Sequence, residues 1–452
     1  MNFTVICNIV LTTFIFIILL LGFVYASVFY KFKEAKQAVV FDTRNLTVFP
    51  LVATLVTSQY GWINGVFEVY FDYGVPAWLI LSLPYLLLNL AWIFLSKYLR
   101  NQGIEIKTTH HLLRHHYGKW VAIIGSLLYV FALMPFMYIH MGGQVLSSFL
   151  NISWFWAVLI FAILSALAFF KEGFKNVVKQ DQWMFFAMFI GLFIILISLW
   201  LKEPHVQSLQ SFIPRVQFNR TMAIEWYLLA LIVFIDPAVH QRIWSAKDNH
   251  TSKKAFGYAL VFWLLFDILV IGIVSQVRTL DASILSLQGI FTILDPWQQL
   301  VLAILSVAVI LSTANTYFFI ATSTLTDDLL KVKSSVTRWV LGLLAMLAIG
   351  LVIYLRYEDK TVVAVLFDFY PIVISTLVFP MVFALLPLPK LLPWQVLMQM
   401  IIAGAICVAI QLELLKIPIF EAQSAIIYGM IAAALVQILF QLFNYVISKK
   451  KR

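Results

Sequence analysis

The stretch ILSTANT, Ile310–Thr316, lies between two apolar runs, VLAILSVAV and YFFIA, in a segment otherwise suited to lipid. It places adjacent hydroxyls, Ser312 and Thr313, near the middle of that segment, and Thr316 follows Ser312 by one helical turn on the same face. One isolated hydroxyl is commonly explained by a bond to the carbonyl four residues earlier, or by a contact between two helices. A cluster that also contains Asn315 is expensive in lipid unless its groups have partners, so the stretch indicates a polar site inside a membrane.

The composition supports a membrane location for this segment. The chain has 452 residues, 62% of them hydrophobic and 12% charged, and its mean hydropathy is +0.94. A soluble protein cannot bury that much apolar surface, so this is an integral membrane protein. Because each crossing takes about 20 apolar residues, the sequence predicts an all-α membrane protein with about thirteen transmembrane helices in a single domain, residues 1–452. The predicted windows are 3–30, 46–70, 75–98, 119–147, 152–170, 181–201, 224–244, 253–277, 297–326, 336–357, 361–385, 393–413 and 422–447.

Several function classes are disfavoured by what the sequence contains. The first window lacks a basic start and its apolar run is too long for a signal peptide, so we expect a retained helix. Both cysteines, Cys7 and Cys407, fall inside predicted helices, which argues against a disulfide framework. The sequence has no GxxxxGK[ST] motif for ATP and no HExxH or Ser-His-Asp arrangement for hydrolysis. We therefore expect no enzyme, and any active transport would use an ion gradient.

The distribution of positive charge predicts the orientation of the chain. With the N-terminus outside, the cytoplasmic segments collect 24 of the 31 Lys and Arg residues, and these include the segment Arg242–Lys254 and the terminal KKKR. Positive residues resist translocation, so the bias predicts an outside N-terminus, a cytoplasmic C-terminus and an odd number of helices in a cell membrane. The same bias attributes the net charge of +10 to membrane topology rather than to nucleic-acid binding, and KKKR is expected to contact anionic lipid headgroups.

Two windows carry signs of an interrupted helix. The second contains TSQYGWING with Gly61 and Gly65, and the seventh contains IDPAVHQR with Asp236 and Pro237. Proline removes a backbone donor and glycine tolerates unusual dihedrals, so a helix can unwind there where protein or water satisfies the freed groups. Simple kinks are the alternative. The breaks lie five helices apart, the spacing expected of two inverted five-helix repeats whose first helices are discontinuous.

Hydroxyls that face an unwound helix predict a cation site. Na⁺ is a hard cation that prefers oxygen ligands, and Ser312 and Thr313 could supply two of them beside carbonyls freed by the break. The residues at the breaks are also candidates for solute binding. These candidates are Gln59, Tyr60, Trp62 and Asp236. A carboxylate inside the membrane indicates function, although Asp236 could instead be a structural partner of Arg242 or His240, and the aromatic residues could pack a core.

Four stretches resemble the sodium:solute symporter family, in the order and spacing of that family. Together they cover nearly the whole chain. They are GIEIKTTHHLLRHHYG (Gly103–Gly118), GFKNVVKQD (Gly173–Asp181), FIDPAVHQRIWSAK (Phe234–Lys247) and AVILSTANTYFFIATSTLTDDL (Ala308–Leu329). Two departures are clear, because TSQYGWING replaces a frequent Ser-Ala-Gly run and TTHHLLRHH replaces the usual Pro-Glu and Arg-Arg.

The resemblance implies the LeuT-type fold of five plus five helices in inverted repeats, with one extra N-terminal helix and two extra C-terminal helices. Repeat 1 would be 46–201 and repeat 2 would be 224–385. The resemblance also implies a sodium site, with hydroxyls from Ser312 and Thr313 and carbonyls from the residues Ala53, Val56 and Val309. Asp181 matches a family acid near the inner exit for sodium; its alternative role is a solvated cap at a helix N-terminus.

The sequence therefore predicts Na⁺-coupled symport of a small organic solute by alternating access, with Na⁺ as the coupling ion. Two alternatives stay open. One is a transporter of the same fold coupled to protons carried by Asp236 or Asp181, and the other is a solute-binding membrane sensor or channel without coupling. The solute is not readable from the sequence, and no obligate protein partner is evident.

Overall fold

The computed structural model describes residues 45–102, 108–132, 134–169, 173–202, 213–332, 334–358, 360–416 and 424–450, and the secondary structure in these ranges is helical apart from an isolated bridge between Leu46 and Ala246. The helices are α2 Val48–Gln59, α3 Ile63–Tyr73, α4 Ala77–Ile80, α5 Ser82–Arg100, α6 Thr109–Ala132, α7 Phe136–Leu150, α8 Trp154–Phe169, α9 Gly173–Lys202, α10 Arg220–Leu229, α11 Ile232–Ile235, α12 Pro237–Ser245, α13 Asn249–Leu280, α14 Leu287–Ile290, α15 Pro296–Ser323, α16 Ser334–Tyr357, α17 Val362–Leu385, α18 Pro393–Gln411 and α19 Ala425–Lys450. A π-helical turn, η3 Thr324–Leu329, continues α15.

The predicted windows from 46–70 to 422–447 all fall on helices of the structure. Within the described ranges, ten helices are long and apolar enough to cross a membrane, and two shorter apolar helices accompany them. The window 3–30, with Cys7, lies outside the described residues. The all-helical membrane fold is therefore confirmed.

The first interruption is confirmed and separates α2 from α3. The chain leaves helical geometry at Tyr60–Trp62, between two segments that together match the window 46–70. Gly61 allows a close approach there, because a Cβ built on it would lie 1.9 Å from Thr313 Oγ1 on α15. The break thus brings the main chain of α2 against the polar stretch of α15.

The second interruption divides the window 224–244 into α10, α11 and α12. Asp236 is extended (φ −63°, ψ 114°), and its carboxylate accepts a hydrogen bond from the Ala238 N–H at 2.7 Å. It thereby caps α12, whose first residue is Pro237, a position where proline forfeits no helical hydrogen bond. The two interrupted helices are also joined at their ends, since Leu46 exchanges backbone hydrogen bonds with Ser245 and Lys247.

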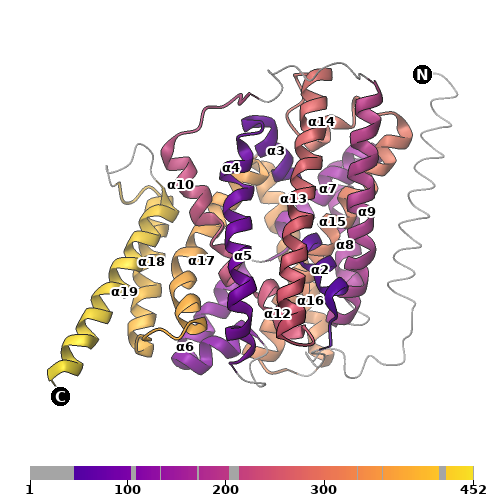
Figure 1. Cartoon of the computed structure of the whole chain (residues 1–452). Helices are drawn as coiled ribbons and strands as arrows, with labels where there is room; N and C mark the ends of the chain where they lie inside the picture. Colours follow the sequence, from indigo (N-terminus) through magenta and orange to yellow (C-terminus); the bar gives the residue numbers. More distant parts are fainter. Residues whose placement is uncertain are drawn as a thin grey trace.

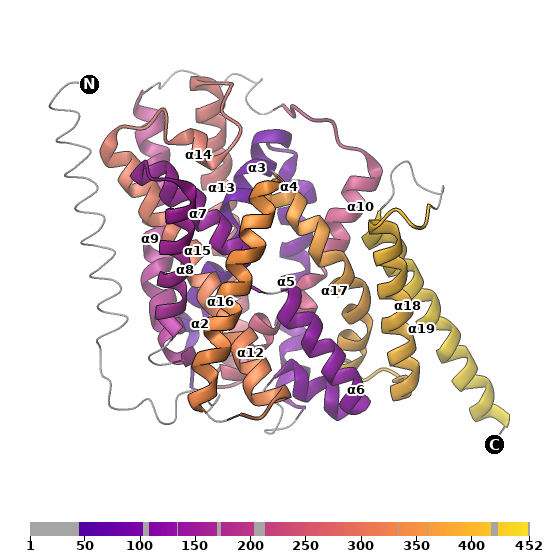
Figure 2. The same cartoon turned by 180° about the vertical axis from the view of Figure 1, so that it is seen from behind.

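The helices pack so that α15 is enclosed by α2, α7, α8 and α9, while α13 packs on α2, α5 and α9 (Figure 1). The C-terminal pair α18 and α19 packs against α17 at one side of the bundle, as both views show (Figures 1 and 2). The enclosed position of α15 explains how its polar groups avoid contact with lipid.

The Asp248 side chain caps α13 by accepting from the Thr251 N–H, and this hydrogen bond lowers the pKa of the Asp248 carboxyl.

Two details of the sequence interpretation are wrong. The predicted window 119–147 begins too late, because α6 already starts at Thr109 and Gly118 (φ 79°) is a kink inside that helix. Arg242 was counted with the cytoplasmic cations, but its side chain is 1% exposed and lies among α2, α9, α12 and α15. An amphipathic connector can fold as a helix without forming an apolar window, and a buried carboxylate can hold a guanidinium inside the protein. Apolar windows and a count of charges therefore reveal neither feature.

Candidate ion and solute site between the interrupted helices

The polar residues of ILSTANT are buried, and each has a partner on a neighbouring element. Ser312 Oγ donates to Asp181 Oδ1 on α9 at 2.6 Å, and Thr316 Oγ1 accepts from Arg242 Nη2 at 3.2 Å. The side-chain amide of Asn315 lies 3.2 Å from that of Gln180. These contacts lead away from α15, so the cluster links helices and does more than bond back to its own backbone.

Thr313 lies at the centre of a set of oxygen atoms. Its Oγ1 is 3.3 Å from the Val309 carbonyl on its own helix and 3.3 Å from the Ser58 carbonyl at the end of α2. A hydroxyl has one proton, so it can satisfy only one of these carbonyls fully at a time. The other carbonyl keeps capacity to bind a cation, and all three atoms are of the kind that Na⁺ prefers.

A second series of oxygen atoms begins at Ala53 and runs to Asp181. The Ala53 carbonyl accepts from Thr57 Oγ1 at 2.9 Å, and Thr57 Oγ1 lies 3.2 Å from Ser312 Oγ. The Asp181 carboxylate, which is fully buried, accepts from both Ser312 and Thr54. Asp181 was interpreted as part of an exit path for the ion, and the structure places it directly against the predicted ligand Ser312.

The buried charge of Asp181 is balanced by Arg242 from α12. Arg242 Nη2 lies 3.7 Å from Asp181 Oδ2, and the two side chains are 1% and 0% exposed. Arg242 also donates from Nε to the carbonyl and hydroxyl oxygens of Thr54 at 3.1 and 2.9 Å, and from Nη1 to the Ala238 carbonyl at 2.9 Å. One guanidinium therefore connects both interrupted helices, α9 and, through Thr316, α15.

Four of the five predicted sodium ligands, all except Val56, thus have oxygen atoms in this hydrogen-bonded network where α2 and α15 meet. Ser312 and Thr313 contact α2, Val309 and Ala53 present carbonyls to neighbouring hydroxyls, and Val56 is fully buried on α2. The donors are neutral oxygen atoms with one carboxylate beside them, a set that suits a monovalent hard cation. The residues present therefore fit Na⁺.

Three of the four predicted solute residues line the larger of two neighbouring cavities beside this crossing: Gln59, Trp62 and Asp236. Ser58, whose carbonyl faces Thr313, also lines it. Tyr60 instead lines a neighbouring cavity, where its hydroxyl donates to the Trp263 carbonyl at 3.1 Å. Asp236 has no ion pair among the described residues, and of its proposed partners Arg242 pairs with Asp181 while His240 Nε2 faces the Phe234 carbonyl.

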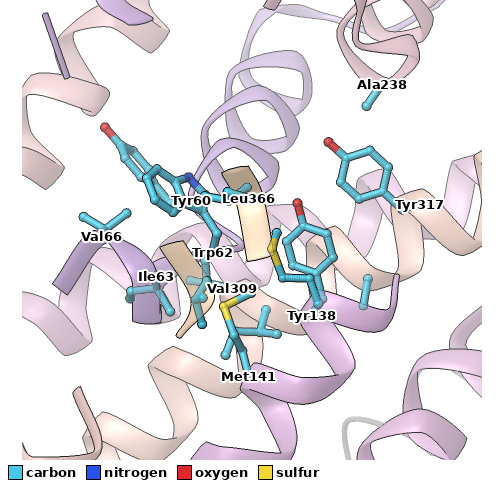
Figure 3. Packing of buried hydrophobic residues seen from close by; sticks show 14 of the residues in the cluster. Tyr60, Trp62, Ile63, Val66, Tyr138, Met141, Ala238, Val309, Tyr317 and Leu366 are labelled. Carbon is cyan, nitrogen blue, oxygen red and sulfur yellow. The ribbon is translucent and has the colours of Figure 1, made fainter. Parts of the chain in front are cut away.

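Sequence reasoning missed four tyrosines of the larger cavity, which come from α5, α7, α15 and α17. They are Tyr85, Tyr138, Tyr317 and Tyr370. Figure 3 shows the rings of Tyr138 and Tyr317 side by side near Leu366 and Trp62, and the two tyrosine rings are stacked with centroids 5.4 Å apart. Only Tyr317 had a local signal, since it directly follows ILSTANT and shares its helix.

No protein-family model and no curated protein matches this sequence. Among solved structures, the chain is similar to a Na⁺-coupled sialic acid symporter in a substrate-bound outward-open state (TM-score 0.74, 10% identity, covering 95% of this chain and 96% of that one). It is also similar to Mhp1, a nucleobase-cation-symport-1 family transporter, in a closed conformation with bromovinylhydantoin bound (TM-score 0.58, 13% identity, 92% and 96% covered). The inward-facing conformation of Mhp1 matches with a TM-score of 0.52 and 13% identity over 90% of this chain and 92% of that one.

These similarities define the class of the molecule. It is an all-helical membrane protein with the LeuT-type fold, as the resemblance to sodium:solute symporters implied. At sequence identities of 10–13%, the structural similarity establishes the fold alone. The ion and the solute therefore depend on this chain's own residues.

Proposed function

We propose that this protein is a multi-pass membrane transporter that couples Na⁺ entry to symport of a small organic solute by alternating access. One observation carries the proposal. The hydroxyl of Thr313 and the carbonyls of Val309 and Ser58 converge at the break in α2, directly beside a cavity that Ser58 also lines. The ion ligands are Ser312 and Thr313 with the carbonyls of the residues Ala53, Val56 and Val309.

The same arrangement supplies a route for coupling. Ser58 and Gln59 end α2, so ordering this end around an ion also orders part of the cavity wall. A solute that needs the ordered wall then binds more tightly with Na⁺ present, and by linkage Na⁺ binds more tightly with the solute present. We further propose that 46–201 and 224–385 are the two inverted repeats, and that the N-terminus lies outside and the C-terminus in the cytoplasm, with KKKR at the lipid headgroups.

The sodium site is tested with Na⁺ itself as the ligand. Purified protein is heated in NaCl or in KCl at equal ionic strength. At Na⁺ concentrations of about 100 times Kd, binding to the folded state alone stabilises it by about 2.7 kcal/mol. We expect this stabilisation to be lost in the Ser312→Ala/Thr313→Ala double variant.

The matched control for the double variant is Thr376→Ala. Thr376 is a buried hydroxyl that bonds back to the Ile372 carbonyl at 2.8 Å, so its loss should leave the Na⁺ response intact. An undiminished Na⁺ response in a folded double variant would remove the ion site from this place.

The two alternatives predict different ion dependence. A proton-coupled transporter would show uptake that follows the pH gradient, persists when K⁺ replaces Na⁺ at fixed pH, and fails in Asp181→Asn or Asp236→Asn. A channel would show flux that rises linearly with solute concentration without saturating. Na⁺-dependent, saturable uptake into proteoliposomes would exclude both.

A further inference from the structure

Aromatic side chains dominate the larger cavity, and they converge from separate parts of the fold. Trp62 comes from the break after α2, and the tyrosines at 85, 138, 317 and 370 come from α5, α7, α15 and α17. Most of the remaining lining is apolar. The apolar residues are Met137, Leu229, Ile232, Val233, Val239 and Leu366, and the polar residues Ser58 and Gln59 complete the wall beside Asp236. A cavity built this way offers ring faces together with one carboxyl group, that of Asp236.

The charge of this lining is negative. Asp236 is the one charged residue among the described residues that line the larger cavity, and neither that cavity nor the neighbouring one is lined by a Lys, Arg or His of the described ranges. The nearby cation, Arg242, directs its donors to Asp181, Thr54, Thr316 and the Ala238 carbonyl. Asp236 therefore has no direct salt bridge among the described residues, although the Arg242 guanidinium still acts on it electrostatically.

The Asp236 carboxylate is held at a fixed place in the wall. One oxygen accepts from the Ala238 N–H at 2.7 Å, and the other accepts from the Tyr317 hydroxyl at 3.1 Å. The Tyr317 ring is in turn stacked on Tyr138, so the carboxylate is attached to an aromatic wall. These hydrogen bonds keep the carboxyl group oriented.

We propose that the transported solute carries an organic ammonium group, of the quaternary or alkylated type, which binds among the rings with Asp236 as its counter-ion. Aromatic faces attract cations most strongly when both are shielded from water, and rings that surround a methylated ammonium are an established way to recognise it. An anionic solute would be repelled by Asp236, and no basic side chain of the lining would offset that repulsion.

This inference rests on the proposed transport function, and binding to the full-length protein tests it. Thermal unfolding is followed with choline, tetramethylammonium, glucose and acetate, and with 3,3-dimethylbutan-1-ol, the uncharged carbon isostere of choline. We expect choline or tetramethylammonium to raise Tm in a saturable way and the isostere to have no effect at the same concentration. Protection by glucose, acetate or the isostere, with none from the two cations, would overturn the proposal.

Two substitutions locate the binding within the cavity. Asp236→Asn removes the charge but retains a good helix cap, so the protein is expected to fold while its apparent affinity for the cation falls roughly tenfold or more. Tyr317→Leu removes one ring and should weaken binding by a similar factor. Asp248→Asn is the matched control, because Asp248 caps α13 in the same manner and is remote from the lining, and it should bind the cation normally. Normal cation binding by a folded Asp236→Asn variant would contradict the assignment.

The same measurements in NaCl and in KCl separate this proposal from the transport proposal. Binding of the cation that is equally tight in both salts would support the solute class and contradict sodium coupling. Na⁺-enhanced binding of glucose or acetate, without any binding of the cations, would support coupling and contradict the solute class. Na⁺-enhanced binding of the cations supports both.

Discussion

Replacing Arg242 by glutamine is expected to destabilise the folded protein by about 3–5 kcal/mol, the range for removing one partner of a buried ion pair. The reason is that Asp181 would stay buried, at 0% exposure, with its charge uncompensated. Thr54, Thr316 and the Ala238 carbonyl would each lose a donor at the same time. The loss is measured as a fall in the yield of monodisperse protein and in the midpoint of thermal unfolding in detergent.

Two companion variants show whether charge or shape is responsible. Arg242→Lys retains the charge but cannot reproduce the several donors with which the guanidinium reaches four groups. The stability of this variant should therefore lie between that of Arg242→Gln and that of the native protein. The Arg242→Gln/Asp181→Asn double variant removes both charges and should recover much of the stability lost in the single variant. An exposed pair serves as the control, since Lys416 and Glu413 are 71% and 81% exposed and Lys416→Gln should leave unfolding unchanged. If Arg242→Gln unfolds like the native protein, the pair is not a structural link.

The sequence predicted the features that depend on residues close together along the chain. Apolar windows of about 20 residues marked the helices, and Gly61 and Pro237 marked the breaks, because proline and glycine act on the backbone where they stand. The hydroxyls of ILSTANT predicted a polar site for a similar reason: lipid does not satisfy them, so protein must. The start of α6 was missed because its first turns are polar and lie outside an apolar window.

What the sequence could not supply is the identity of partners that are distant along the chain. Arg242 and Asp181 are 61 positions apart, and a count of cations by side assigns Arg242 to a cytoplasmic loop. Tyr85 and Tyr370 resemble any interfacial or core aromatic until the packing of α5 and α17 places them in one cavity. Contacts between helices decide both cases, and a single sequence contains no direct record of such contacts.

Replacing Gly61 by alanine is expected to abolish the Na⁺ response and to destabilise the fold by about 1–3 kcal/mol, as overpacking does. An added Cβ would lie 1.9 Å from Thr313 Oγ1 and 2.2 Å from Thr313 Cβ. Rotation of the threonine side chain moves the first atom but not the second, so α2 and α15 must move apart. Because the proposed ion ligands come from these two helices, their separation should eliminate the stabilisation by NaCl over KCl.

A second substitution distinguishes the steric effect from the loss of a ligand. Thr313→Gly removes the atoms that the added methyl group would meet, so Gly61→Ala/Thr313→Gly should have nearly the same midpoint of thermal unfolding as Thr313→Gly alone. Neither variant should show the Na⁺ response, because the Thr313 hydroxyl is absent from both. Gly257→Ala is the control for glycine replacement, since a Cβ there meets nothing within 4 Å, and it should be neutral or stabilising by roughly 0.5–1 kcal/mol. A Gly61→Ala variant that keeps its Na⁺-dependent stabilisation would show that the ion does not bind where α2 and α15 cross, and the coupling route through Ser58 would then have no basis.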